Sequence, residues 1–270
     1  MKACVFINLP AAVDRRQSVE ASFAAAQANG WSLHRFEALG PADVASVPGT
    51  ISPAEKACFA SHRDALGRHL AGDDPVLIAE DDAVFAPQAF AVLDALLAQH
   101  PGIDVIYGDV VCDFNLMVHL ASRRDGLIAR GEYEAIDLTG RPYFAALAYV
   151  VRGSAKRRLH DALSAMTELN QPYDIALRGL CHSGQFRMAV AFPFLATVSS
   201  LADGSQIQTR GAGVFDATLN AFRRLMFAAR DLDECRADIA RLQIAADGDT
   251  ARLTGALFSV MASPAFSADG

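Results

Sequence analysis

The sequence lacks the features that mark several classes of protein. It contains five cysteines, none of them in a CxxC pair, so neither a disulfide framework nor a zinc site is expected. No apolar run approaches the length of a membrane span, and the longest one, residues 143–151, ends at Arg152. We therefore expect a cytoplasmic protein with free thiols and without a transmembrane segment.

Positive charge is also scarce. The chain has 24 Lys and Arg against 31 Asp and Glu, and no Lys/Arg-dense face stands out. Nucleic acid is therefore not an expected partner, because its phosphates are bound by clustered cations. Glycine-rich phosphate loops of the GxGxxG and GxxxxGK types are missing as well. A phosphate ligand would have to be held by a few placed groups and a metal ion.

Apolar residues are plentiful and suffice for one large domain or two small ones, since 52% of the 270 residues are hydrophobic. A buried strand is predicted over residues 3–7, a helix between residues 14 and 29, and a second strand over residues 31–38. Ser52 and Glu55 form a capping box at the start of a further helix. The βαβ beginning predicts the α/β class, with a parallel sheet covered by helices.

The triplet Glu80-Asp81-Asp82 follows directly on an apolar strand predicted over residues 75–79. Three carboxylates at a buried strand end repel one another and lose hydration, so a cation is expected beside them. Mg²⁺ and Mn²⁺ take carboxylate oxygens and commonly hold substrate phosphates too. A solvated acidic turn that caps the next helix explains the triplet equally well. A phosphatase or nucleotidyltransferase is less favoured, because no Thr follows the acids at the phosphatase spacing.

Other polar residues lie close to the predicted strand ends. Arg15 and Arg16 fall in the first turn of the helix that follows strand 3–7, where one of them could contact a nucleotide phosphate. His62 lies on an apolar helix face, which is typical of a hydrogen-bonded core residue. Asp109 is the second acid at a predicted strand end, and Asp174 opens a later helix, where an ordinary dipole-stabilising role would explain it.

The remaining segments are less regular. We expect an exposed hairpin or mobile loop at residues 123–126, a single strand over 142–151, a last edge strand over 187–195 and a loop over 199–210. From about residue 216 the apolar spacing predicts a helical tail that reaches residue 261. Such a tail could pack on the sheet, pair with a second copy in a homodimer, or contact a membrane surface peripherally.

Several stretches, taken in order over roughly residues 3–210, resemble glycosyltransferase family 25, the lipopolysaccharide and collagen galactosyltransferases. They are similar to the family's opening "INL…R.DR", its "feA" strand, its "E.gC..SH" helix, its "LILEDD" strand end, its "YlIs..gA" segment, its "P.D" turn and a late "S.I". The corresponding segments here are Val5 to Leu9 with Asp14-Arg15-Arg16, Arg35 to Ala38, Glu55 to His62, Leu77 to Asp82, Tyr149 to Ala155, Pro172 to Asp174 and Ser205 to Ile207.

The resemblance implies a GT-A-like fold: a Rossmann-type mixed sheet flanked by helices over residues 1–214, with a helical C-terminal extension over residues 215–270. It implies a UDP-sugar donor, Mn²⁺ or Mg²⁺ as cofactor, and transfer of a hexose, galactose or glucose, to a saccharide acceptor such as lipopolysaccharide or another surface glycan. Family members that transfer galactose invert the anomeric centre, which requires a carboxylate base.

Carried onto this sequence, the resemblance makes Asp82 and Glu80 the metal ligands. Asp174 becomes the candidate base, with Asp109 in reserve. The residues expected to contact the nucleotide-sugar are Asn8, Arg15, Arg16, Ser61, His62, Glu80 and Asp81. One departure stands out, since Leu39-Gly40 replaces the Asp-Gly pair that usually follows the family's "feA" strand. A degenerate, non-catalytic member that binds a glycan or a protein is therefore the alternative.

Overall fold

Apolar side chains alternate along the central strands and contribute to two large hydrophobic clusters of the core. The computed structural model describes residues 1–200 and 213–245. In strand β3 (Val76–Glu80), Val76 and Ile78 belong to one cluster, while Leu77 and Ala79 belong to the other. The sheet is therefore buried on both faces, as in proteins whose sheet is covered by helices on both sides.

The main sheet formed by these residues has seven strands, in the order β2-β1-β3-β9-β5-β10-β7. Strand β1 is parallel to β2 and β3, and β5 is parallel to β10, whereas β9 and β7 are antiparallel to their neighbours. The other strands of this sheet are β1 (Lys2–Asn8), β2 (Trp31–Glu37), β5 (Val105–Tyr107), β7 (Glu134–Asp137), β9 (Ala148–Val151) and β10 (Met188–Phe192). The predicted α/β fold with a mixed sheet is confirmed.

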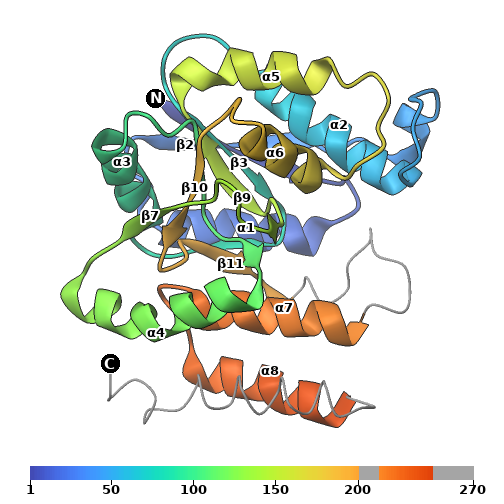
Figure 1. Cartoon of the computed structure of the whole chain (residues 1–270). Helices are drawn as coiled ribbons and strands as arrows, with labels where there is room; N and C mark the ends of the chain where they lie inside the picture. Colours follow the sequence, from blue (N-terminus) through green and yellow to red (C-terminus); the bar gives the residue numbers. More distant parts are fainter. Residues whose placement is uncertain (201–212, 246–270) are drawn as a thin grey trace.

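Two short ladders extend this framework: β4 (Ala83–Phe85) pairs with β11 (Ala196–Val198), and β6 (Val111–Cys112) pairs with β8 (Tyr143–Phe144). Helices α2, α5 and α6 lie together on one side of the sheet, and α1 and α3 supply side chains to the second cluster (Figure 1). Their bounds are α1 (Val13–Ala25), α2 (Pro53–Gly67), α3 (Ala89–Gln99), α5 (Lys156–Ser164) and α6 (Tyr173–His182); short 3-10 turns cover Pro41–Val44 and Gly153–Ala155.

Helix α2 begins where the capping box predicts. Ser52 Oγ accepts a hydrogen bond from the Glu55 backbone N–H at 3.2 Å, and Glu55 Oε2 accepts one from the Ser52 N–H at 2.8 Å. These reciprocal bonds satisfy two of the donors that a helix start leaves unpaired. They fix the helix that carries Ser61 and His62 toward the sheet.

The expected hairpin or loop at residues 123–126 is wrong, because these residues lie inside α4 (Phe114–Arg130). Asp113 caps the helix by accepting the backbone N–H groups of Asn115 and Leu116, and Gly131 ends it with a left-handed φ of 66°. Arg124 is buried rather than exposed, and its guanidinium donates to the carbonyls of residues 227 and 228. Contacts with residues more than a hundred positions away thus bury a face of helix α4 that looks polar in the sequence.

Two strand predictions need correction. The single strand expected over residues 142–151 is broken into β8 and β9 at Ala145, whose φ is 80°. The segment around β10 is not an edge strand, since β10 lies between β5 and β7. Ala145 is held in this conformation by Asp174, whose Oδ2 accepts the Ala145 backbone N–H at 2.9 Å. A positive φ strains any residue with a Cβ, so this bend is imposed by its surroundings.

Ala145→Gly is expected to stabilise the fold by roughly 0.5–1 kcal/mol, because relief of the left-handed strain exceeds the added chain entropy of glycine. Urea unfolding followed by the fluorescence of Trp31, the one tryptophan of the sequence, measures the change. Ala146→Gly is the matched control and should destabilise, since Ala146 has no positive φ and is buried. Equal losses from both substitutions would show that Ala145 carries no strain.

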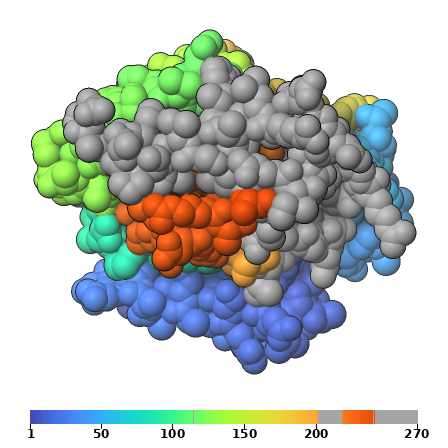
Figure 2. All heavy atoms as spheres, turned by 90° about the horizontal axis from the view of Figure 1, so that it is seen from below, coloured from blue at the N-terminus to red at the C-terminus, as the bar shows by residue number. Residues whose placement is uncertain are grey.

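Two helices of the expected tail are present, α7 (Gly213–Met226) and α8 (Leu232–Ala245). Phe222 and Leu225 of α7 belong to the same buried cluster as the sheet, and Figure 2 shows α8 (orange-red) forming part of the surface seen from below. The helix expected near residues 253–261 and most of the loop at 199–210 lie outside the described residues. The division into segments 1–214 and 215–270 stays a prediction. Among the helices described, none is long and apolar enough to cross a bilayer.

Candidate functional site

The triplet and Asn8 meet at one edge of the sheet because β1 and β3 are parallel neighbours, with Ile7 opposite Glu80. Asn8 Nδ2 donates to Asp81 Oδ2 at 2.7 Å, and Arg15 Nη1 donates to Asp81 Oδ1 at 3.1 Å. Both carboxylate oxygens of Asp81 are thus bonded to protein groups. Asp81 therefore anchors the loop after β1 to the end of β3.

Asn8 is almost fully buried and is itself held by three further contacts. Its Nδ2 also donates to the Ala12 carbonyl at 3.0 Å, its Oδ1 accepts Arg35 Nε at 2.9 Å, and its carbonyl accepts Arg35 Nη2 at 3.3 Å. With every polar atom of its side chain bonded inside the protein, Asn8 shapes the site rather than offering an open contact to a ligand.

Of the two arginines predicted near a phosphate, Arg15 reaches the triplet and Arg16 does not. Arg15 Nη1 also lies 3.6 Å from Asp82 Oδ2. Arg16 instead pairs with Glu20 one turn along α1, at 2.8 Å, and its side chain is 48% exposed. Such an exposed pair contributes little to stability and places no charge at the site.

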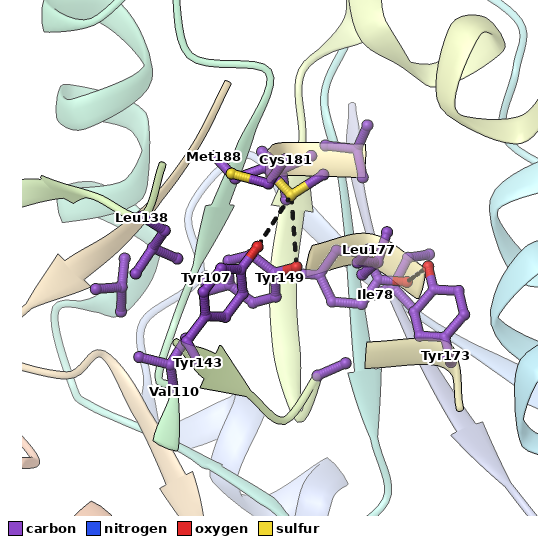
Figure 3. Packing of buried hydrophobic residues seen from close by; sticks show 14 of the residues in the cluster. Ile78, Tyr107, Val110, Leu138, Tyr143, Tyr149, Tyr173, Leu177, Cys181 and Met188 are labelled. Carbon is purple, nitrogen blue, oxygen red and sulfur yellow. Dashed lines mark hydrogen bonds between the residues drawn. The ribbon is translucent and has the colours of Figure 1, made fainter. Parts of the chain in front are cut away.

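His62 is buried, as the simplest interpretation of the sequence predicts, yet it also belongs to the site. Its Nε2 lies 3.5 Å from Glu80 Oε1, and its Nδ1 lies 3.1 Å from the Tyr149 hydroxyl. That hydroxyl is 2.6 Å from the hydroxyl of Tyr173. Figure 3 labels both tyrosines and marks this hydrogen bond with a dashed line. The imidazole ring of His62 stacks on the ring of Tyr173, with the two ring centroids 4.3 Å apart. The orientation of His62 is therefore fixed on both sides.

Ser61 lines the site, but its hydroxyl group is hydrogen-bonded within the protein. Its Oγ donates to the Ala57 carbonyl at 2.7 Å and accepts the Leu39 backbone N–H at 2.9 Å. The second bond joins α2 to the segment after β2. Ser61 therefore positions Leu39, which follows strand β2.

Asp82 has the electrostatics of a cation ligand. Its Oδ1 is buried and has no hydrogen-bond partner among the described residues. Burial and the neighbouring charge of Glu80 raise the pKa of Asp82 to about 7, although Arg15 opposes this rise. Burial also acts against the charged form of Glu80, but the hydrogen bond from His62 and the charges of Arg223 and Arg15 hold its pKa below the usual value. A divalent cation would relieve the repulsion between the two carboxylates.

A cavity of about 340 Å³ opens beside these groups. Its polar lining residues are Arg15, the triplet, Ser61 and His62. The apolar lining residues are Ile7, Leu9, Ala38, Leu39, Pro41, Ala54 and Ala57, and Cys58 also lines the cavity. Such a combination of an apolar wall with a few convergent polar groups is typical of a small-molecule site.

The two acids predicted as bases differ in their surroundings. Asp174 lies in the first turn of α6, and its charge acts on Cys58, which lines the cavity. Its Oδ1 accepts the Ile175 N–H, and its Oδ2 the Ala145 N–H, so the carboxylate is fixed in orientation. Asp109 is fully buried and pairs with Arg223 at 2.5 Å.

Arg223 of α7 is the residue that sequence reasoning missed. Burial opposes its charged form, but the charges of Asp109, Asp82 and Glu80 outweigh burial and raise its pKa. Its Nη2 is buried without a hydrogen-bond partner among the described residues. No motif surrounds it, and its contact with Asp109 spans 114 positions, so only the folded chain reveals it. Arg223 brings a second cation toward the acidic triplet.

No protein-family model and no curated protein matches the sequence. A solved structure described as the galactosyltransferase LgtC in complex with donor and acceptor sugar analogs is similar over 70% of this chain and 72% of its own. The two share 16% identity with a TM-score of 0.44. A likeness this remote does not identify a family, so the function has to be inferred from the residues of the site.

Proposed function

We propose that this chain is a metal-dependent, GT-A-like glycosyltransferase similar to family 25. It would move a hexose, galactose or glucose, from a UDP-sugar to a saccharide acceptor such as lipopolysaccharide or another surface glycan. The supporting observation is the buried Asp82 Oδ1, which has no partner among the described residues and belongs to a carboxylate on the wall of the cavity. Arg15 lines the same wall.

Glu80 and Asp82 are the residues that would hold Mn²⁺ or Mg²⁺. Their oxygens suit hard divalent cations, and the open oxygen of Asp82 and the repulsion between the two groups both fit a bound cation. Such an ion neutralises negative charge on a leaving diphosphate. Asp81, with both oxygens bonded to Asn8 and Arg15, would hold the loop in place instead of binding the ion.

The cavity supplies the other contacts of a UDP-sugar. Its volume of about 340 Å³ lies within the range of about 300–1,000 Å³ that is common for small-molecule sites. The apolar wall near Leu39 suits a uracil ring and ribose, while Arg15 and Arg223 bring positive charge toward the diphosphate. Charged contacts to the diphosphate and apolar contacts to the nucleoside would fix the direction of the donor.

Asp174 is the proposed base, which would take the proton of the acceptor hydroxyl in an inverting transfer. The two backbone N–H bonds orient its carboxylate and leave further lone pairs for that proton. Asp109 is a weaker candidate than the sequence suggests, because its buried carboxylate faces Arg223.

Asp174→Asn is expected to lower the transfer rate by roughly 10²- to 10⁴-fold, because the amide cannot take the proton of the acceptor hydroxyl. The stabilisation of the protein by UDP and Mn²⁺ should be unchanged. Steady-state kinetics and thermal unfolding measure the two effects, with Asp161→Asn, an exposed acid of α5, as the control. Full activity of Asp174→Asn would remove Asp174 from the reaction.

Binding tests the proposal without knowledge of the acceptor. UDP and Mn²⁺ together should raise the thermal unfolding temperature, since a ligand of the folded state at 100 times its Kd adds about 2.7 kcal/mol. Mn²⁺ alone or UDP alone should have a smaller effect, because the ion and the diphosphate bind each other as well as the protein. No shift with any nucleoside diphosphate and metal ion would contradict the proposal.

One observation supports the alternative, a non-catalytic protein that binds a glycan or a partner protein. Leu39 presents an apolar side chain to the cavity, where the family resemblance leads us to expect a carboxylate. A chain that only binds a glycan or protein would show no hydrolysis of the donor. Cytoplasmic location, peripheral membrane contact through the C-terminal helices and a homodimer stay predictions.

A further inference from the structure

Cys58, His62 and Glu80 form a second cluster of possible metal ligands on the cavity wall. One ligand atom from each residue lies within 4.8 Å of the other two. Cys58 and His62 are four residues apart in α2 and therefore project from the same face, and β3 brings Glu80 opposite them. The sequence predicts no zinc site because it contains no CxxC pair. The packing of helix α2 against strand β3 nevertheless brings together a different set of possible metal ligands.

We propose that these three residues bind a thiophilic transition-metal ion of the Zn²⁺ or Co²⁺ class, with the fourth position open to the cavity. Nitrogen and oxygen ligands lie about 2.0–2.2 Å from tetrahedral zinc, which places such a pair roughly 3.3–3.5 Å apart. His62 Nε2 and Glu80 Oε1 already lie 3.5 Å apart. A thiolate and an imidazole in the set favour this class of ion over Mg²⁺ or Mn²⁺.

The surroundings of His62 fit a metal ligand. The Tyr149 hydroxyl next to Nδ1 and the stacked Tyr173 ring hold the imidazole with Nε2 toward Glu80. Metal-bound histidines commonly have their second ring nitrogen hydrogen-bonded in this way. Glu80 can adjust to the ion, because its side chain is 36% exposed whereas that of His62 is 1% exposed. Binding displaces the Cys58 thiol proton to solvent, and His62 would face the ion as a neutral imidazole with its ring proton on Nδ1, next to the Tyr149 hydroxyl.

The consequence is competition at Glu80. If the proposed function is correct, Glu80 is shared with the Mn²⁺ site, and a thiophilic ion bound by Cys58 and His62 would exclude the nucleotide-sugar. Ion binding itself does not depend on the proposed function; only the competition does. The pair of sites would make the protein sensitive to the zinc-to-manganese ratio around it.

Co²⁺ titration of the reduced full-length chain tests the site. We expect saturation at one equivalent, with d–d bands of tetrahedral cobalt and a sulfur-to-cobalt charge-transfer band in the near ultraviolet. Cys58→Ser should remove the charge-transfer band. The control is Cys4→Ala, which removes a buried thiol of the hydrophobic core and should retain the band. Absence of the band in the wild-type protein, or its persistence in Cys58→Ser, would overturn the proposal. Unchanged thermal unfolding of metal-free Cys58→Ser shows that the variant is folded.

Displacement experiments separate this proposal from the proposed function. Zn²⁺ should bleach the cobalt bands, and excess Mn²⁺ alone should not. UDP with Mn²⁺ should bleach them if both sites share Glu80. Cobalt bands that survive UDP and Mn²⁺ would support the thiophilic site and contradict the competition. Bands that Mn²⁺ alone removes would contradict selectivity for a thiophilic ion.

Discussion

Asp82→Asn is expected to abolish the thermal stabilisation by UDP and Mn²⁺ and to lower the transfer rate by roughly 10³-fold. The amide keeps the shape of the side chain but removes the charge that would hold the ion. A bound metal ion contributes several kcal/mol to stabilising the leaving diphosphate, which corresponds to about this factor. Differential scanning fluorimetry and steady-state kinetics measure the two losses.

The same substitution should stabilise the metal-free fold at high pH. The pKa of Asp82 is about 7 in the folded chain against 3.8 for an ordinary aspartate, because burial and Glu80 disfavour its charge. Above pH 7 the charge therefore costs stability, and that cost falls as the pH drops from 7 toward 4, where the folded chain takes up the proton. Asp82→Asn should add about 1–3 kcal/mol at pH 8 and little near pH 4.

Asp14→Asn provides the control, since Asp14 is an exposed acid in the first turn of α1 near the same edge of the sheet. It should not change the response to Mn²⁺. A loss of stability in metal-free Asp82→Asn at pH 8 would mean that the contact with Arg15 outweighs the repulsion from Glu80.

Arg223→Met is expected to destabilise the protein by about 3–5 kcal/mol, because it leaves the carboxylate of Asp109 buried and unpaired. This places α7 among the elements that hold the site together. Urea unfolding should detect the loss as a lower midpoint with an unchanged slope.

A second change distinguishes a structural from a binding role of Arg223. In the double variant Arg223→Met, Asp109→Leu, no buried charge is left alone, so most of the lost stability should return. If Arg223 also contacts the diphosphate, this stable double variant should still bind UDP and Mn²⁺ more weakly than the wild-type chain. If both the stability and the affinity for UDP and Mn²⁺ recovered, the role of Arg223 would be only to pair with Asp109.

The parts of the site that sequence predicts are those set by local rules. The apolar run before the triplet predicts strand β3 and places the acids at its carboxyl end. The capping box at Ser52 fixes the helix that carries His62. Each of these depends on neighbours in the chain or on the periodicity of a single strand, and a pattern of residues can express that.

What the sequence does not predict depends on distant contacts. The sequence predicts Arg124 in an exposed hairpin or loop and Arg223 on a polar helix face, but partners about a hundred positions away bury both. No glycine or proline marks the break at Ala145 in the sequence, because the hydrogen bond that holds it comes from Asp174 of helix α6. The Cys58, His62 and Glu80 cluster likewise needs the packing of α2 against β3. Such features follow from tertiary packing, which overrides local preference.

Hydrolysis of a panel of UDP- and GDP-sugars with Mn²⁺ is the most direct measurement of the proposed activity, since it requires neither the acceptor nor the linkage. We predict that the wild-type chain hydrolyses at least one UDP-hexose in the presence of Mn²⁺, and that Asp82→Asn does not. Absence of hydrolysis with every donor, or hydrolysis that survives both removal of the metal ion and loss of the Asp82 carboxylate, would contradict a metal-dependent glycosyltransferase.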